Sequence, residues 1–146
     1  MTERTSLPSP RPVARRCAIA LAGLTTVGAL AGVQGFLSGE FDPLVDRLTF
    51  VNGPLVPAVA LAMCVGVPQG AALVLGLRRH ARAPQAALGA GVVLTGWVVA
   101  QLPLIGWESP VQWTFFAVGL AETAAAARWR GFGTNGPGDA AAPGRA

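Results

Sequence analysis

Long apolar stretches bounded by arginine dominate this chain and leave few folds open to it. The four stretches, at about residues 17–37, 55–77, 85–105 and 110–127, are each close to the roughly 20 residues that a helix needs to cross a bilayer. Hydrophobic residues make up 52% of the 146 residues and charged residues only 12%, which is too apolar for a soluble domain of this length. The chain is therefore predicted to be an all-α, polytopic membrane protein with four transmembrane helices in an up-down bundle.

The arginines predict an orientation for this bundle. All eleven basic residues are arginine: four precede the first stretch, three lie between the second and third, and three follow the fourth, against one between the first and second. Because arginine accumulates on the cytoplasmic side of membrane proteins, both termini are predicted to be cytoplasmic and the protein to lie in the inner (plasma) membrane. The net charge of +4 then belongs to membrane flanks, and no nucleic-acid partner is predicted.

Both ends of the chain lack a pattern that could form a core. Residues 1–16 are rich in proline, serine and arginine and are predicted to be a disordered basic cytoplasmic arm, and residues 131–146 a disordered tail. The transmembrane domain is thus placed at residues 17–130. The first stretch also resembles a secretory signal with a cleavage site near Ala31. We favour an uncleaved helix because the apolar run continues to Leu37.

The loop at residues 38–53 is the most acidic part of the chain and contains its own amphipathic pattern. Asp42 and Pro43 form a suitable cap and first turn for a helix. The apolar residues around them share one helical face: Phe41, Leu44, Val45 and Leu48. This pattern predicts a short helix lying flat on the outer leaflet.

Pro68 lies near the middle of the second stretch, where proline disrupts a helix. It is predicted to kink the helix and to free the carbonyl of Cys64, four residues earlier. Freed backbone groups need partners in lipid. The side chain of Gln69, at almost the same depth, is the expected donor.

Two pairs of glycines are spaced for close helix contact. Gly28 and Gly32 lie four residues apart in the first stretch, and Gly66 and Gly70 repeat the spacing in the second. Such faces let a neighbouring helix approach closely in the bilayer. The neighbour is predicted to be a helix of the same chain, another membrane protein or a second copy in a homo-oligomer.

Glutamines and tryptophans gather at the predicted outer end of the bundle. Gln101 and Gln112 flank a short hairpin, and Gln34 is predicted to lie at the same depth. Three tryptophans lie nearby in the sequence: Trp97, Trp107 and Trp113. One interpretation is a pocket for a lipid or another apolar molecule with a polar head. The other is that these residues only anchor the helices at the interface.

Glu122 is an acid inside the fourth stretch. It recurs at helical spacing with Gln112, Phe116 and Gly119, so this face is predicted to point into the bundle. Glu122 could be a proton-handling carboxylate. The interpretation that we favour is a structural partner that reaches a flanking arginine, Arg128 or Arg16.

Metal and cofactor sites are not predicted. The chain has one histidine, His80 in a basic loop, and its two cysteines are predicted to lie at different depths, Cys17 at a membrane edge and Cys64 near the bilayer middle. This set is too small for a site of ordinary ligand number, and a disulfide is not expected.

Three segments resemble a known group of proteins. They read FVNGPLVPA, GVPQGAAL and LTGWVVAQLPLIGWESPVQWTFFAVGLAE and extend from about Phe50 to Glu122. In these residues the chain resembles uncharacterised actinobacterial small four-helix integral membrane proteins. The resemblance implies the four-helix fold and no established activity. Members often carry an acid where this chain has Gln101.

The sequence leaves several functions open. The first is a non-enzymatic bundle that binds a partner membrane protein or an apolar, lipid-like ligand. The second is a small intramembrane enzyme, an acid-catalysed isomerase or cyclase of a prenyl-type substrate, with Glu122, or Asp42 and Asp46, as proton donors. The third is a proton-coupled exporter.

Overall fold

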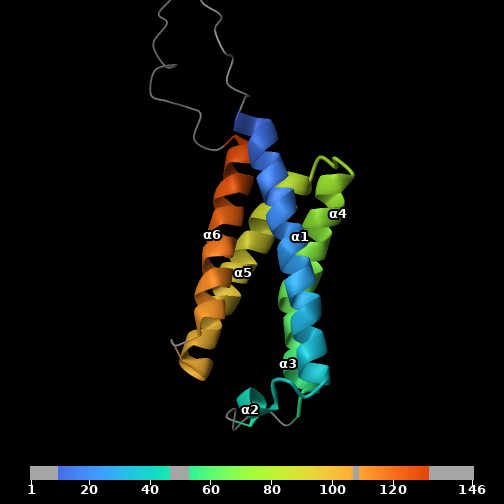
Figure 1. Cartoon of the computed structure of the whole chain (residues 1–146). Coiled ribbons are helices and arrows are strands. Elements are labelled where there is room, and N and C mark those ends of the chain that lie inside the picture. Colours follow the sequence, from blue (N-terminus) through green and yellow to red (C-terminus); the bar gives the residue numbers. More distant parts are fainter. Residues whose placement is uncertain (1–9, 47–52, 107–108, 132–146) are drawn as a thin grey trace, which may run out of the picture.

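The computed structural model describes residues 10–46, 53–106 and 109–131, and every regular element among them is a helix (Figure 1). The all-α prediction is therefore confirmed. The elements are α1 (Pro10–Leu37), α2 (Asp42–Val45), α3 (Leu55–Leu61), the π-helix η1 (Ala62–Gly66), α4 (Val67–Leu77), α5 (Ala83–Ile105) and α6 (Pro110–Arg130). Since α3, η1 and α4 follow one another without a break, the described residues form four long helical rods.

The observed helix bounds agree with the predicted stretches to within three residues except at the start of α1, with α5 beginning at Ala83 and α6 ending at Arg130. The second rod begins at Leu55 and ends at Leu77, and α5 ends at Ile105, as predicted. α1, however, begins at Pro10, so the basic arm predicted at residues 1–16 is wrong for residues 10–16, and the remainder lies outside the described residues. Proline is tolerated in a first helical turn. The guanidinium of Arg15 also donates a hydrogen bond to the carbonyl of Gly76 at 3.1 Å.

Three of the helical rods are long and apolar enough to cross a membrane: Pro12–Leu37, Leu55–Leu77 and Ala83–Leu104. α6 has 21 residues, which is also sufficient in length. It carries Gln112, Glu122, Arg128 and Arg130 and is not among the three.

The rods are arranged as two antiparallel pairs (Figure 1). α5 lies against α6, and α1 lies against α3, η1 and α4; the pairs meet through α1 with α6 and α4 with α5. We call the end that carries α2 the α2 end. The opposite end, where Arg15, Arg78, Arg82 and Arg128 lie, is the arginine end.

Alanine forms much of the interior between the rods. The larger cluster, towards the arginine end, consists of Ala18, Ala22, Ala72, Ala87, Ala90, Ala125 and Ala126. A second cluster, towards the α2 end, consists of Ala29, Val65 and Leu94 with Leu61, Trp97, Phe115 and Val118 against it. Small side chains let helices approach closely, which favours association in lipid.

The outer surface of the rods carries many large apolar side chains. Leu24, Val27 and Leu30 of α1 are all more than 60% exposed, at 62%, 66% and 65%. The largest fully buried side chains are polar: Gln69, Glu122 and Thr25. A soluble protein would expose a large apolar surface of this kind only at an interface. The distribution is typical of helices surrounded by lipid.

α5 and α6 approach one another backbone to backbone at two glycines. A Cβ added at Gly91 would lie 2.8 Å from the backbone nitrogen of Thr123, and one at Gly119 would lie 3.0 Å from that of Thr95. The hydroxyls of Thr95 and Thr123 donate to the carbonyls of Gly91 and Gly119 at 2.9 and 2.8 Å. Each helix thus presents a glycine and a threonine four residues apart to the other.

Pro68 is preceded by a π-helical turn, η1. The N–H of Val67 donates to the carbonyl of Ala62, five residues earlier, whereas an α-helix bonds residues four apart. Proline has no N–H to offer the preceding turn. The predicted disturbance around Pro68 therefore takes the form of a wider turn within a continuous rod.

α2 is shorter than the amphipathic helix predicted for the first loop. Val45 is buried, and the ring of Phe41 lies 5.0 Å from that of Phe36 and covers Gly35. Asp42 lies within the helix, and the capping residue is Phe41, without a side-chain capping bond. The predicted contribution of Leu48 lies outside the described residues.

Candidate functional site

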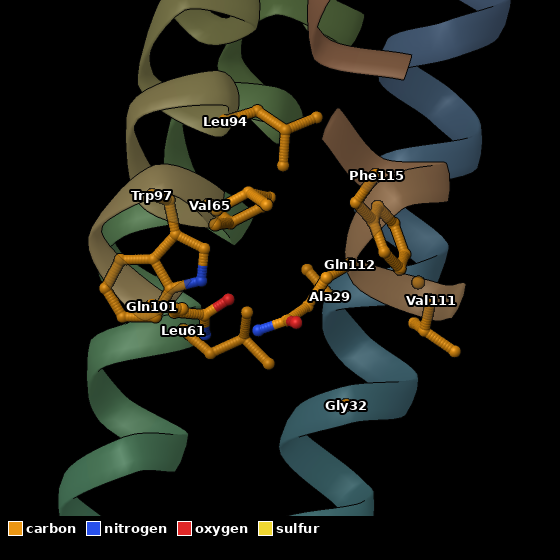
Figure 2. Close-up of a pocket in the computed structure, with 12 residues that line it drawn as sticks. Ala29, Gly32, Leu61, Val65, Leu94, Trp97, Gln101, Val111, Gln112 and Phe115 are labelled. Atoms are coloured by element: carbon orange, nitrogen blue, oxygen red, sulfur yellow. The ribbon is translucent and has the colours of Figure 1, made fainter. Parts of the chain in front are cut away.

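A cavity of about 160 Å³ lies between the rods near the α2 end (Figure 2). α1, α3, η1, α5 and α6 all contribute to its wall. The lining residues are Gly28, Ala29, Gly32, Leu61, Val65, Leu94, Trp97, Val98, Gln101, Val111, Gln112 and Phe115. None of them is charged. We call this space the α2-end cavity.

Two glutamines bring polar atoms to this apolar cavity. Gln101, near the end of α5, and Gln112, in the first turn of α6, point towards one another across it, with Trp97 beside Gln101 (Figure 2). The side chain of Gln112 is only 8% exposed. Neither its amide nitrogen nor its amide oxygen has a hydrogen-bond partner. Gln112 therefore presents an unused donor and an unused acceptor to the cavity.

The structure brings together only part of the predicted pocket. Trp97, Gln101 and Gln112 line the cavity. Gln34 is exposed and Trp113 is 43% exposed, with its ring 6.0 Å from Phe116, and neither lines the cavity. Trp107 lies outside the described residues.

The rotation of each helix explains these differences. The buried positions of α1 include Ala14, Ala18, Ala22, Thr25 and Ala29, spaced three or four residues apart, and this register turns Gln34 outward. Of the two phenylalanines on α6, Phe115 lines the cavity, whereas Phe116, which the helical spacing predicts on the inward face, does not. Phe115 follows Gln112 by three residues, so the spacing itself contained this signal.

Glu122 lies deep in the bundle and does not reach an arginine. Its side chain has no exposed surface, and its Oε2 accepts a hydrogen bond from Nε2 of Gln69 at 2.8 Å. The favoured interpretation, a side chain that extends to Arg128 or Arg16, is therefore wrong. Ala125 and Ala126 fill the space on the side of the arginine end, so extension towards water is blocked.

Gln69 has a different role from the one predicted for it. Its Nε2 donates to Glu122 and, at 3.4 Å, to the carbonyl of Ala90. The donor thus reaches α5 and α6 and not the carbonyl of Cys64 in its own rod. The π-turn before Pro68 precedes Gln69 directly, and sequence spacing alone does not give the direction of a side chain after such a turn.

The three candidate proton donors do not lie together in one site. Asp42 and Asp46 are exposed at the α2 end, whereas Glu122 lies beyond Gly119 on α6, away from the α2-end cavity. Within the described residues, no acid lines this cavity. The arrangement can bind an uncharged group, but it places no carboxyl against one.

The four glycines predicted to contact a partner separate into two groups. A Cβ at Gly28 would lie 3.1 Å from the Phe115 ring, and one at Gly32 would lie 2.7 Å from Leu61, so this pair faces its own chain. Gly66 and Gly70 line an outward-facing groove between α1 and the second rod. Contact with another membrane protein or a second copy thus stays a prediction for Gly66 and Gly70 alone.

Comparison of the chain with protein-family models, with curated proteins and with solved structures found no match. The function proposed below is therefore based on the geometry of the cavity.

Proposed function

We propose that this protein is an inner-membrane bundle that crosses the bilayer four times and binds an uncharged, apolar, lipid-like ligand in the α2-end cavity. The proposed membrane location is supported by three apolar helices and an apolar outer surface. The fourth crossing is α6, whose outward residues include Val111 and Leu120 and whose last turn carries Arg128 and Arg130. The arginine end is then cytoplasmic, and the α2 end faces outward.

The observation that carries the ligand proposal is the side chain of Gln112. A buried polar group without a partner costs about 1–3 kcal/mol, and Gln112 has two such atoms beside an open space. A ligand that supplies an acceptor and a donor would remove this cost. The apolar wall would hold the rest of the molecule.

The wall also indicates what chemical class of ligand fits. With no charged residue in it, a charged group would enter without a counter-charge, which is costly. A hydroxyl or carbonyl suits the glutamine amides, which donate and accept. A cavity near 150 Å³ holds a molecule of about the size of benzene, so the 160 Å³ here fits one end of a lipid-like molecule.

Binding is better supported than catalysis. Acid catalysis on a prenyl-type substrate needs a carboxyl within hydrogen-bond reach of the reacting group. Glu122 lies outside the cavity and accepts a hydrogen bond from Gln69. Asp42 and Asp46 are exposed. Gln101 and Gln112 are neutral amides and cannot serve as strong acids.

Native mass spectrometry of the protein purified in mild detergent tests the proposal. We expect the wild type to carry one neutral, apolar molecule. Gln112→Leu is expected to bind it about tenfold more weakly, which corresponds to roughly 1.4 kcal/mol, and so to show a lower occupancy. Gln34→Leu is the matched control, because Gln34 is an exposed glutamine outside the cavity. Equal occupancy in all three proteins, or none in the wild type, would contradict ligand binding at Gln112.

A further inference from the structure

A polar layer separates the two apolar clusters of the bundle. Gln69 of α4 and Glu122 of α6 lie between the alanine cluster at one side and the cluster of Ala29, Val65 and Leu94 at the other. Both side chains have no exposed surface. This layer is distinct from the α2-end cavity, which neither residue lines.

One hydrogen bond joins the pair, and two oxygens remain. Nε2 of Gln69 donates to Oε2 of Glu122 at 2.8 Å and to the carbonyl of Ala90 at 3.4 Å, so both hydrogens of the amide are used. Oε1 of Gln69 and Oε1 of Glu122 have no hydrogen-bond partner. An amide oxygen and a carboxylate oxygen both only accept, so the two atoms left over cannot satisfy one another as they stand.

A proton on Glu122 would give both of these oxygens a hydrogen-bond partner. A protonated carboxyl has one O–H donor, and an O–H on Oε1 can donate to the amide oxygen of Gln69. The acid and the amide would then be joined by two parallel hydrogen bonds, N–H to Oε2 and O–H to the Oε1 of Gln69. The pair would be neutral, and each of its polar atoms would be used.

The surroundings favour the neutral form because charged groups lie beyond the alanine cluster. Every packed helix carries its basic residues at the arginine end: Arg11, Arg15 and Arg16 on α1, Arg78 after α4, Arg82 before α5, and Arg128 and Arg130 on α6. Ala18, Ala72 and Ala126 lie between these residues and the pair. The remaining titratable groups on these rods, Cys17 and Cys64, are exposed. A buried carboxylate here would lack a counter-charge.

We propose that Glu122 and Gln69 form a buried proton-binding site, in which Glu122 is a neutral carboxylic acid that donates to the amide oxygen of Gln69. The ligand of this site is a proton. The site is independent of the lipid-like ligand, so either proposal can fail without the other.

Infrared difference spectroscopy of the full-length protein in detergent at neutral pH tests the site. The wild-type minus Glu122→Gln spectrum is expected to contain the carbonyl band of a protonated carboxylic acid. Gln69→Leu should shift this band, because the carboxyl then loses its N–H donor, whereas a merely structural role of Gln69 would leave it in place. A carboxylate band in place of the acid band would overturn the proposal.

Thermal unfolding gives a second measurement that does not depend on the spectra. Glutamine in place of a neutral acid can keep both hydrogen bonds, so Glu122→Gln is expected to unfold within about 2 °C of the wild type, and Glu122→Leu at least about 4 °C lower. If Glu122→Gln fails to fold while sodium chloride, compared with choline chloride, raises the wild-type midpoint, the site binds a metal cation and the proton proposal is wrong.

Discussion

Replacing Gly91 with alanine is expected to lower the free energy of unfolding by about 1–3 kcal/mol, the usual range for an overpacked interior. A Cβ at this position would lie 2.8 Å from the backbone nitrogen of Thr123 and 3.0 Å from the carbonyl oxygen of Gly119. Backbone atoms cannot rotate away as a side chain can, so α5 and α6 must separate. Denaturation in mixed micelles, followed by circular dichroism, measures the change.

Gly89→Ala is the matched control for this prediction. Gly89 lies in the same helix, and an added Cβ there meets nothing within 4 Å. Alanine in place of glycine favours a helix by up to about 1 kcal/mol, so the control should be neutral or slightly stabilising. Equal effects at Gly89 and Gly91 would show that α5 and α6 do not cross closely at Gly91.

Gln69→Leu is expected to destabilise the bundle by about 2–4 kcal/mol. The change removes the donor to Glu122, and a buried acceptor left without a partner costs about 1–3 kcal/mol. It also removes a second hydrogen bond to the Ala90 carbonyl, which keeps its bond within α5, and a lost bond of this kind costs about 0.5–1.5 kcal/mol. The double variant Gln69→Leu, Glu122→Leu should recover part of this loss, since replacing both partners of a buried polar pair by apolar groups is often nearly neutral.

A double-mutant cycle separates this coupling from simple loss of packing. The two single variants and the double variant are unfolded under the same conditions, and their effects should differ from additivity by at least about 0.5 kcal/mol, as expected for residues in contact. Additive effects would mean that the hydrogen bond between Gln69 and Glu122 contributes nothing to stability.

Most helix bounds could be predicted from the sequence because they follow the bounds of the apolar runs. Apolar runs predict the extent of the second rod, the end of α5 and the start of α6. The start of α1 could not be predicted in this way. Arg15, in the segment predicted to be disordered, contacts α4 across the bundle, and no local pattern contains such a contact.

The rotation of the helices was harder to predict, and this decided which site residues were missed. The interior contains mostly alanine, and the outer surface is also apolar, so hydropathy scarcely distinguishes the two faces. Gln34 was placed inside and is exposed. The spacing of Gly91 with Thr95 and of Gly119 with Thr123 was present in the sequence, but so were other small-residue pairs. Only the contacts between α5 and α6 show which pairs are used.

Whether α6 crosses the membrane can be measured directly, and both proposals assume that it does. Single cysteines at Ser109, just before α6, and at Asn135, which follows α6 in the sequence, are placed in a chain whose Cys17 and Cys64 are serine. We predict that a membrane-impermeant maleimide labels Ser109→Cys in intact cells and labels Asn135→Cys only after the cells are permeabilised. Labelling of both positions from the same side would contradict the four-span bundle.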